Sequence, residues 1–361
     1  MTDETTKIKL EDLGYDEFFD SKYRSSGLEG LSIGRVVAEH KEAYRVKSPN
    51  GEYLAKITGK QIFKAVKRAD YPAVGDWVAI SELDGKKAVI RHILPRKTIL
   101  KKKYSDKQDA QVIAANIDTA FIVEAMDRDY NLNRLERYLV LTNEAGIEPV
   151  IVLNKTDLIP QIELDQRIKE IKNRFGEIDV LRTSAVENRG LDELTNRISK
   201  GKTYCFLGSS GVGKSSLINK LLKKNAIETR EISGSTGKGR HTTTTREMYF
   251  LESGGIVIDN PGTREVGITE AGTGIEHVFD EIISLSQKCK YVDCAHVREP
   301  GCAVLQALRE GKLDKAKYEN YIKLRKENEF YEMTDADKKK KERRFGKFLK
   351  KAIDQLKELE S

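Results

Sequence analysis

The spacing of apolar positions divides this chain into three regions. In the first, residues 30–110, short runs alternate apolar and polar residues with the period of two that a half-buried strand requires. Asn50-Gly51 and Asp84-Gly85 interrupt these runs and are typical of hairpin turns. The pattern predicts a small β-barrel of the OB type, with an unrelated small β domain as the alternative.

The pattern changes in the second region, residues 111–272, where compact apolar strands alternate with segments of helical periodicity. This alternation predicts an α/β domain with a mostly parallel sheet. The third region, residues 273–335, has helical patterns around a short stretch rich in cysteine. Residues 1–29 suit either a mobile extension or a short helix, and residues 336–361 form a lysine-rich tail. We therefore expect a multidomain α/β protein.

Composition narrows the class of protein. Apolar residues make up 39% of the 361 positions and charged residues 34%, which favours a soluble protein with real cores. The polar start MTDETTKIKLEDLG does not resemble a signal peptide, and no apolar run reaches the roughly 18 residues of a membrane span. We expect a cytoplasmic protein, and since nothing indicates an obligate oligomer, a monomer.

Positive charge is unevenly distributed. The formal net charge is +7, and lysine and arginine cluster in residues 96–104 and 337–351. Such clusters suit a polyanionic partner, RNA or DNA. A solvated, solubilising surface is an equally good interpretation of either cluster alone.

One motif indicates phosphate binding. Gly208-x4-Gly213-Lys214-Ser215 follows an apolar strand and opens a helix, as a P-loop requires. In that loop backbone N–H groups and the helix N-terminus face the phosphates, Lys214 reaches the β- and γ-phosphates, and the Ser215 hydroxyl ligates Mg²⁺. The candidate phosphate-binding residues are Gly208, Ser209, Ser210, Gly211, Val212, Gly213, Lys214, Ser215 and Ser216.

A second motif indicates which base is bound. Asn154-Lys155-x-Asp157 ends a buried strand, and the Asp157 carboxylate can accept two hydrogen bonds from guanine N1–H and the 2-amino group, a pair that adenine does not offer. We expect Asn154 to brace neighbouring loops and the Lys155 stem to pack over the base. Ser184 and Ala185 follow a later strand, and the Ala185 N–H is a candidate donor to guanine O6.

The remaining nucleotide loops follow the P-loop. Asp259 would hold Mg²⁺ through water, and the Gly262 amide would sense the γ-phosphate. The loop GSTGKGRHTTTTREM, residues 234–248, offers a second Mg²⁺ ligand, for which Thr243 is preferred over its neighbours Thr242 and Thr244. A solvent-exposed loop hydroxyl is the alternative for each threonine.

The motif order is reversed relative to an ordinary GTPase. The base loops come first, then the P-loop, then the two switch loops. Because the ends of an α/β domain often lie close together, circular permutation can move the termini and preserve the site. The segment LDELTNRISKGKTYCFL, residues 191–207, would join the former last helix to the former first strand.

Four residues indicate a structural metal site. Cys289, Cys294, His296 and Cys302 lie in one short stretch, and three thiolates with an imidazole suit a closed tetrahedral Zn²⁺ site. The wide first spacing leaves three core cysteines as the alternative. The fourth cysteine, Cys205, lies in an apolar strand and is expected to be a small core residue.

Taken together, these motifs resemble the RsgA (YjeQ/YloQ-type) family of circularly permuted GTPases over roughly residues 30–335. The motifs that carry the resemblance are GDWV, NKTD, GSSGVGKSS, GRHTTT, DNPGTRE and the Cys/His knot. The family implies an OB barrel, a permuted GTPase domain and a zinc-binding helical domain. It also implies GTP hydrolysis with Mg²⁺, stimulated by the small ribosomal subunit in late maturation, and contact with its rRNA.

The water-orienting residue is not the usual glutamine. Thr263 takes that position after Gly262, and threonine does not reach an attacking water as glutamine does. His241 is the nearest alternative, and the resemblance supports it; packing on rRNA or capping the loop is the other interpretation. The catalytic candidates are His241, Lys214 and Thr243. Two alternative functions stay open: a large-subunit assembly GTPase, and an RNA-binding placeholder with incidental hydrolysis.

Overall fold

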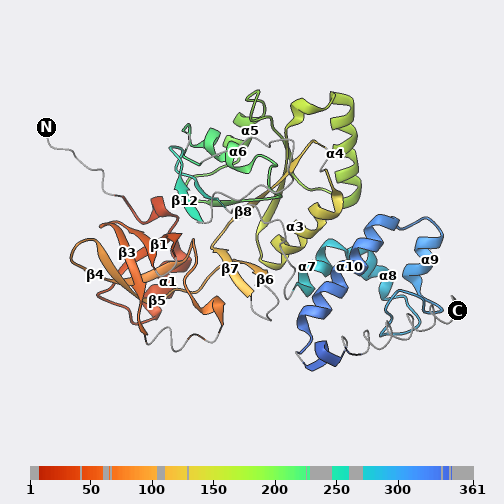
Figure 1. The fold of residues 1–361 in the computed structure, drawn as a ribbon, viewed down its shortest axis with the longest axis horizontal. Coiled ribbons are helices and arrows are strands. Elements are labelled where there is room, and N and C mark those ends of the chain that lie inside the picture. The colour runs from red at the N-terminus through yellow and green to blue at the C-terminus, as the bar shows by residue number, and fades with distance from the viewer. Residues whose placement is uncertain are drawn as a thin grey trace, which may run out of the picture.

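The computed structural model describes residues 8–40, 43–59, 65, 67–103, 110–127, 130–224, 226–227, 246–259, 271–334, 336–340 and 343. Figure 1 shows three neighbouring units along the chain: a red-to-orange barrel, a yellow-to-green α/β unit and a blue helical unit. The three units match the predicted fold class.

A five-stranded barrel forms the first unit. Its strands are β1 (Ser32–Glu39), β2 (Tyr44–Ser48), β3 (Gly51–Ile57), β4 (Trp77–Leu83) and β5 (Lys87–Ile93), with a 3₁₀ turn η2 (Arg68–Asp70) before β4. The strand order is β1-β2-β3-β5-β4, and β4 pairs with β1 to close the barrel. Only the β3–β5 pairing is parallel. Alternate positions bury Val36, Val46, Val78, Ile80 and Ile90, which explains the period-two pattern.

The segment before the barrel is helical where the structure describes it. A 3₁₀ turn η1 (Glu11–Leu13) precedes helix α1 (Glu17–Ser25), whose N-cap is Asp16. Tyr15 and Phe19 pack on the barrel residue Trp77, with ring centroids 4.9 and 5.7 Å from it. Of the two interpretations open for this extension, the helix is the one found.

A two-stranded hairpin connects the barrel to the α/β unit. Strands β6 (Ile99–Lys103) and β7 (Ala110–Ala115) pair antiparallel, and Figure 1 places them between the other units. The sequence pattern did not predict β6, because its three consecutive lysines conceal the alternation.

The α/β unit has six strands in the order β10-β9-β8-β11-β13-β12. All neighbours are parallel except β12, which pairs antiparallel with β13. The strands are β8 (Thr119–Ala125), β9 (Glu148–Asn154), β10 (Val180–Arg182), β11 (Thr203–Leu207), β12 (Glu247–Phe250) and β13 (Ile256–Asp259). The helices are α3 (Leu132–Glu144), α4 (Gln161–Phe175), α5 (Leu191–Asn196) and α6 (Lys214–Leu221), with a 3₁₀ turn η3 (Thr156–Leu158). The predicted mostly parallel sheet is confirmed.

In the described part of the last unit, four named helices pack together. They are α7 (Gly272–Val278), α8 (Asp280–Ser286), α9 (Ala303–Arg309) and α10 (Lys315–Glu332). Helix α3 of the α/β unit lies against α7 and α10, where Arg137 makes a bidentate ion pair with Glu327 at 2.7 and 2.8 Å. None of the helices that the structure describes is long and apolar enough to cross a membrane.

Candidate nucleotide site and metal centre

The two nucleotide motifs meet at one edge of the central sheet. Asn154 ends β9 and Leu207 ends β11, and β8 lies between these parallel strands. Since parallel strands end at the same edge, motifs about fifty positions apart in the chain become neighbours there. Crevices beyond the carboxyl ends of such strands are the usual ligand sites in open α/β sheets.

The P-loop backbone requires glycine at both glycine positions of the motif, Gly208 and Gly213. Gly208 has φ 146° and Gly213 has φ 97°, values that favour glycine. A Cβ atom at Gly208 would lie 2.4 Å from the Val123 carbonyl oxygen, and one at Gly213 would lie 2.2 Å from Asn154 Nδ2. Helix α6 begins directly after Gly213, so its first turn faces the loop.

Lys214 begins helix α6, Asp259 ends strand β13, and the charges of the two side chains interact. Lys214 is 6% exposed, and its Nζ donates to the carbonyl oxygens of Gly208 at 2.8 Å and Ser209 at 2.6 Å. Burial lowers the pKa of Lys214 to about 8, against the opposing effect of the Asp259 charge. Burial also raises the pKa of Asp259, which Lys214 partly offsets. A buried cation and a buried carboxylate at the end of a P-loop suit a phosphate with a bound metal ion.

Asn154 joins three loops of the site. Its Nδ2 donates to the Val212 carbonyl at 2.8 Å, and its Oδ1 accepts from the Thr183 hydroxyl at 3.1 Å. Asn154 is 1% exposed, so these bonds are shielded from water. The base motif therefore fixes the position of the P-loop through a single amide side chain.

The base motif itself is ordered by short polar contacts. The Ser184 hydroxyl donates to Asp157 Oδ1 at 2.5 Å, and the Glu187 N–H donates to the same hydroxyl. Ala185 follows Ser184 in this loop, so Asp157 and the Ala185 amide belong to adjoining turns. Lys155 has φ 60°, and its Nζ pairs with Asp127 Oδ2 at 2.9 Å. Asp127 carries no motif, and the sequence analysis did not identify it.

Several predicted residues cannot be placed. His241, Thr243 and Gly262, together with Thr242 and Thr244, lie outside the described residues. Ser215 and Ser216 are in the first turn of α6, where both are partly buried.

The cysteine-rich stretch brings its four candidate ligands together. Their ligand atoms all lie within 4.8 Å of one another. Cys289 Sγ is 3.8 Å from Cys302 Sγ, and His296 Nδ1 is 3.6 and 3.5 Å from these two sulfurs. A tetrahedral Zn²⁺ with ordinary bond lengths has edges of about 3.8 Å between sulfurs and about 3.5 Å between sulfur and nitrogen. The residues therefore fit a closed zinc site, with Nδ1 as the imidazole ligand.

Residues outside the cluster hold this cysteine-rich loop in place. Glu299 accepts from the backbone N–H groups of Val297 and Arg298 at 2.9 and 3.0 Å, and these backbone donors hold its pKa down to about 2. From α10, Tyr318 donates to the His296 carbonyl and Arg325 donates to the Ala295 carbonyl, each at 2.7 Å. Tyr318 and Arg325 could not be predicted, since both belong to a helix with no motif.

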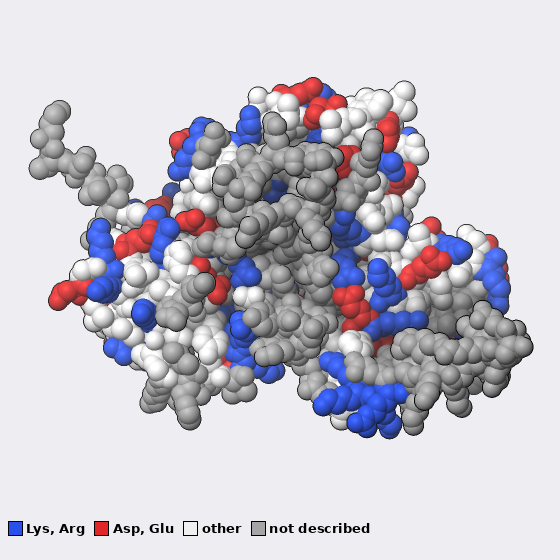
Figure 2. Space-filling model, viewed as in Figure 1, with Lys and Arg blue, Asp and Glu red and all other residues white. Residues whose placement is uncertain are grey.

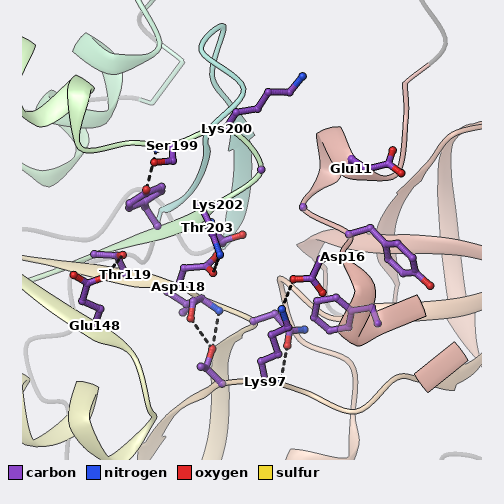
Figure 3. A pocket seen from close by; sticks show the side chains of 18 of the residues that line it. Glu11, Asp16, Lys97, Asp118, Thr119, Glu148, Ser199, Lys200, Lys202 and Thr203 are labelled. Carbon is purple, nitrogen blue, oxygen red and sulfur yellow. Dashed lines mark hydrogen bonds and ion pairs between the residues drawn. The ribbon is translucent and has the colours of Figure 1, made fainter. Parts of the chain in front are cut away.

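A cavity lies away from the nucleotide motifs. It measures about 1020 Å³ and opens at the amino ends of β8, β9 and β11, the opposite edge of the sheet. Figure 3 shows its ion pairs, including Lys202 with Asp118 at 2.9 Å and Lys97 with Asp16. Its lining holds four acidic and four basic side chains, so it offers no excess positive charge to a phosphate: Glu11, Asp16, Asp118, Glu148, Lys97, Arg197, Lys200 and Lys202.

Comparisons with known proteins agree with this geometry. The family model described as RsgA GTPase matches residues 93–269. The chain is 40% identical over 352 residues to the small ribosomal subunit biogenesis GTPase RsgA 1 of Bacteroides thetaiotaomicron, covering 97% of both chains. It is also 40% identical to the RsgA protein of the same description from Opitutus terrae, covering 90% of each chain.

Two solved structures have a similar fold. YjeQ from Thermotoga maritima matches with a TM-score of 0.59 and 30% identity, covering 81% of this chain and 96% of that one. YloQ, described as a circularly permuted GTPase, matches with a TM-score of 0.58 and 24% identity, covering 86% of this chain and 99% of that one. The second likeness concerns the fold alone.

Proposed function

This chain belongs to the RsgA GTPase family, and we propose that it carries out its GTP hydrolysis on the small ribosomal subunit, late in the maturation of that particle. The observation that carries the proposal is the meeting of two motifs, because Asn154 of the base loop bonds the P-loop carbonyl of Val212. The two relatives compared above are described as small ribosomal subunit biogenesis GTPases.

Guanine recognition belongs to the base loops in this proposal. Asp157 accepts from guanine N1–H and the 2-amino group, and the Ala185 amide donates to O6. Ser184 keeps the Asp157 carboxylate oriented through its hydroxyl. The Lys155 stem covers one face of the ring. A purine without the 2-amino group leaves part of the carboxylate unsatisfied, which costs about 1–3 kcal/mol.

Phosphate binding belongs to the P-loop and its neighbours. The amides of residues 208–216 surround the β-phosphate, and Lys214 turns from the Gly208 and Ser209 carbonyls to the β- and γ-phosphates. Ser215, Thr243 and Asp259 would hold Mg²⁺, which neutralises phosphate charge when bound. Asp259 is 3% exposed at the end of β13, a position suited to a metal-bound water. Gly262 would sense the γ-phosphate.

His241 orients the attacking water in this proposal. Its ring accepts a hydrogen bond from the water once the ribosomal particle is bound. A His241→Ala variant is then expected to bind GTP as the parent does and to lose most subunit-stimulated turnover. Retention of full stimulated turnover would remove His241 from the mechanism.

Surface charge supports an RNA-containing partner. Figure 2 shows Lys and Arg side chains gathered near the β6–β7 hairpin and where the chain leaves α10. Lys339 and Lys340 are exposed there. Positive charge at these two places on one face of the molecule suits the phosphate backbone of rRNA. We further propose one structural Zn²⁺ held by Cys289, Cys294, His296 and Cys302, and a monomer acting in the cytoplasm.

Cosedimentation tests the choice of subunit. The protein is mixed with separated small and large ribosomal subunits in the presence of a non-hydrolysable GTP analogue or of GDP. We expect retention on small subunits with the analogue and weaker retention with GDP. Predominant binding to large subunits would refute the proposal.

A further inference from the structure

Lys155 is held in place by more than its own loop. Its backbone is in the left-handed region at φ 60° and ψ 37°, which an L-residue adopts at a cost. Its side chain is 23% exposed, and the Nζ lies 2.9 Å from Asp127 Oδ2. The ammonium is thus anchored at its tip while the backbone is fixed at the other end.

The sheet brings Asp127 to this position. Strand β8 lies between β9 and β11, and its last residue Ala125 is paired with Asn154. Directly after the strand, the Met126 N–H donates to the Asn154 carbonyl at 2.8 Å. This bond locks the two strand ends together, so the residues that follow them, Asp127 and Lys155, face one another.

We propose that Asp127 is a positioning residue for guanine binding, whose carboxylate holds the Lys155 ammonium so that the lysine stem is already placed against the base. The inference rests on the proposed function, in which the Lys155 stem covers the ring. Asp127 itself touches neither the phosphates nor the edge of the base.

The expected effect follows from side-chain entropy. A lysine that moves freely before binding loses rotamer freedom when the base is bound, and a lysine already anchored loses less. Removal of the anchor should therefore weaken nucleotide binding about threefold to tenfold. Because the stem contacts the ring in every bound state, GDP, GTP and ITP should weaken by the same factor. KM should rise while kcat stays unchanged, as for any uniform binding contact.

The chain supplies a matched control at the other end of the same strand. Asp118 precedes β8 and pairs with Lys202, also at 2.9 Å, but it lies at the opposite edge of the sheet, beside the large cavity (Figure 3). An Asp118→Ala variant should leave nucleotide affinity unchanged. If the loss of any Asp–Lys pair near β8 lowered nucleotide affinity, Asp118→Ala and Asp127→Ala would weaken binding equally.

The experiment measures GDP, GTP and ITP affinity by fluorescence titration for the parent, Asp127→Ala, Asp127→Asn, Asp118→Ala and Lys155→Met. Asp127→Ala should lose about threefold to tenfold for all three nucleotides, and Asp127→Asn less, because its amide oxygen still accepts from the ammonium. In the Lys155→Met background, Asp127→Ala should have no further effect.

Three results would overturn the inference: a Kd within twofold of the parent for Asp127→Ala, a full additional loss in the Lys155→Met background, or a loss confined to kcat. Asp157→Asn separates this outcome from failure of the proposed function. If Asp157→Asn leaves the preference for GTP over ITP intact, the base site itself is wrongly assigned. If that preference disappears and Asp127→Ala binds nucleotides as the parent does, the positioning role of Asp127 is wrong and the proposed base site stands.

Discussion

Lys214 is a buried lysine whose ammonium donates hydrogen bonds to two backbone carbonyls of its own loop. Burial places its pKa at about 8, within the range of ordinary buffers. A phosphate beside it favours the charged form and raises that pKa again. Below pH 8 the lysine is protonated in both states, and above pH 8 binding must take up a proton.

GDP affinity is therefore expected to fall as pH rises above 8, by up to about tenfold per pH unit. The Kd for GDP is measured between pH 7 and pH 9 for the parent and for Lys214→Met. The variant should bind weakly and show a flatter profile. Loss of the guanine N1 proton affects both proteins alike, so the difference between the two curves reports on the lysine. Parallel curves would contradict the assignment.

Asp157 should decide which base is bound. Asp157→Asn replaces an acceptor with an amide that can donate, and xanthine carries a carbonyl where guanine carries the 2-amino group. The variant should lose at least about tenfold in GTP affinity and gain affinity for XTP. Competition between GTP and XTP for the variant measures this, and an unchanged order of preference would contradict the prediction.

At the scale of single elements, we predict that the cysteine-rich loop is stabilised by a bound Zn²⁺. Cys302 is both a candidate ligand and the N-cap of α9, where its Sγ accepts from the Leu305 N–H at 3.4 Å. Removal of the ion would break the bonds that join the three cysteines to His296, and the thiolates would take up protons. A strong chelator should therefore lower the thermal midpoint and increase proteolysis between residues 289 and 302.

Zinc content distinguishes the ligands from the remaining cysteine. The parent and Cys205→Ala should each bind one Zn²⁺ per chain, and Cys302→Ala should bind none. Cys205 is fully buried in β11 and serves as a control for loss of a thiol. One Zn²⁺ bound by Cys302→Ala would contradict the assignment.

The elements that could be predicted are those whose pattern is set by local burial. Strands β8, β9 and β11 are mostly buried and carry compact apolar runs, so their sequences identified them. The P-loop and base motif were found because their chemistry requires fixed spacing. Asp127, Tyr318 and Arg325 act through contacts that only the folded chain creates, and their neighbours in sequence give no indication of them.

The way the barrel closes could not be predicted from the sequence pattern either. The pattern predicted short strands, but the parallel β3–β5 pairing and the bridge from Ala38 to Glu247, which connects barrel and α/β sheet, are long-range choices. Arg35 interrupts an apolar run in β1, and this charged position is a sequence signal of the junction between the barrel and the α/β unit.

At the scale of the whole molecule, Arg35 joins the barrel to the α/β unit. It is 1% exposed and donates to the carbonyls of Leu13, Gly75 and Asn116 and to the Thr203 hydroxyl. These acceptors come from four separate segments. Burial lowers the pKa of Arg35 to about 10.

Arg35→Lys should destabilise the protein by roughly 2–4 kcal/mol, because one ammonium cannot satisfy all four acceptors. Urea unfolding measures the change. Arg45→Lys is the matched control: Arg45 pairs with Glu52 and Glu247 at the partly exposed surface of the neighbouring strand, and its replacement should cost less than about 1 kcal/mol. Equal costs for the two variants would show that the junction does not depend on Arg35.

The permuted order of motifs places the end of the α/β unit close in sequence to the start of the helical unit. Asp259 of the switch region and the start of α7 at Gly272 are close in sequence, and α7 lies against α3, which also contacts α10. The base motif, the P-loop and the cysteine-rich loop are thereby connected through a few adjoining elements. The proposed activity needs this connection, since the particle that is bound must influence hydrolysis.

Steady-state GTP turnover with purified ribosomal subunits tests the central claim most directly. The rate of phosphate release is measured for the protein alone, with small subunits and with large subunits, at equal concentrations of each. A slow rate that small subunits raise strongly and large subunits leave unchanged is the predicted result. No stimulation by small subunits, or stronger stimulation by large subunits, would contradict it.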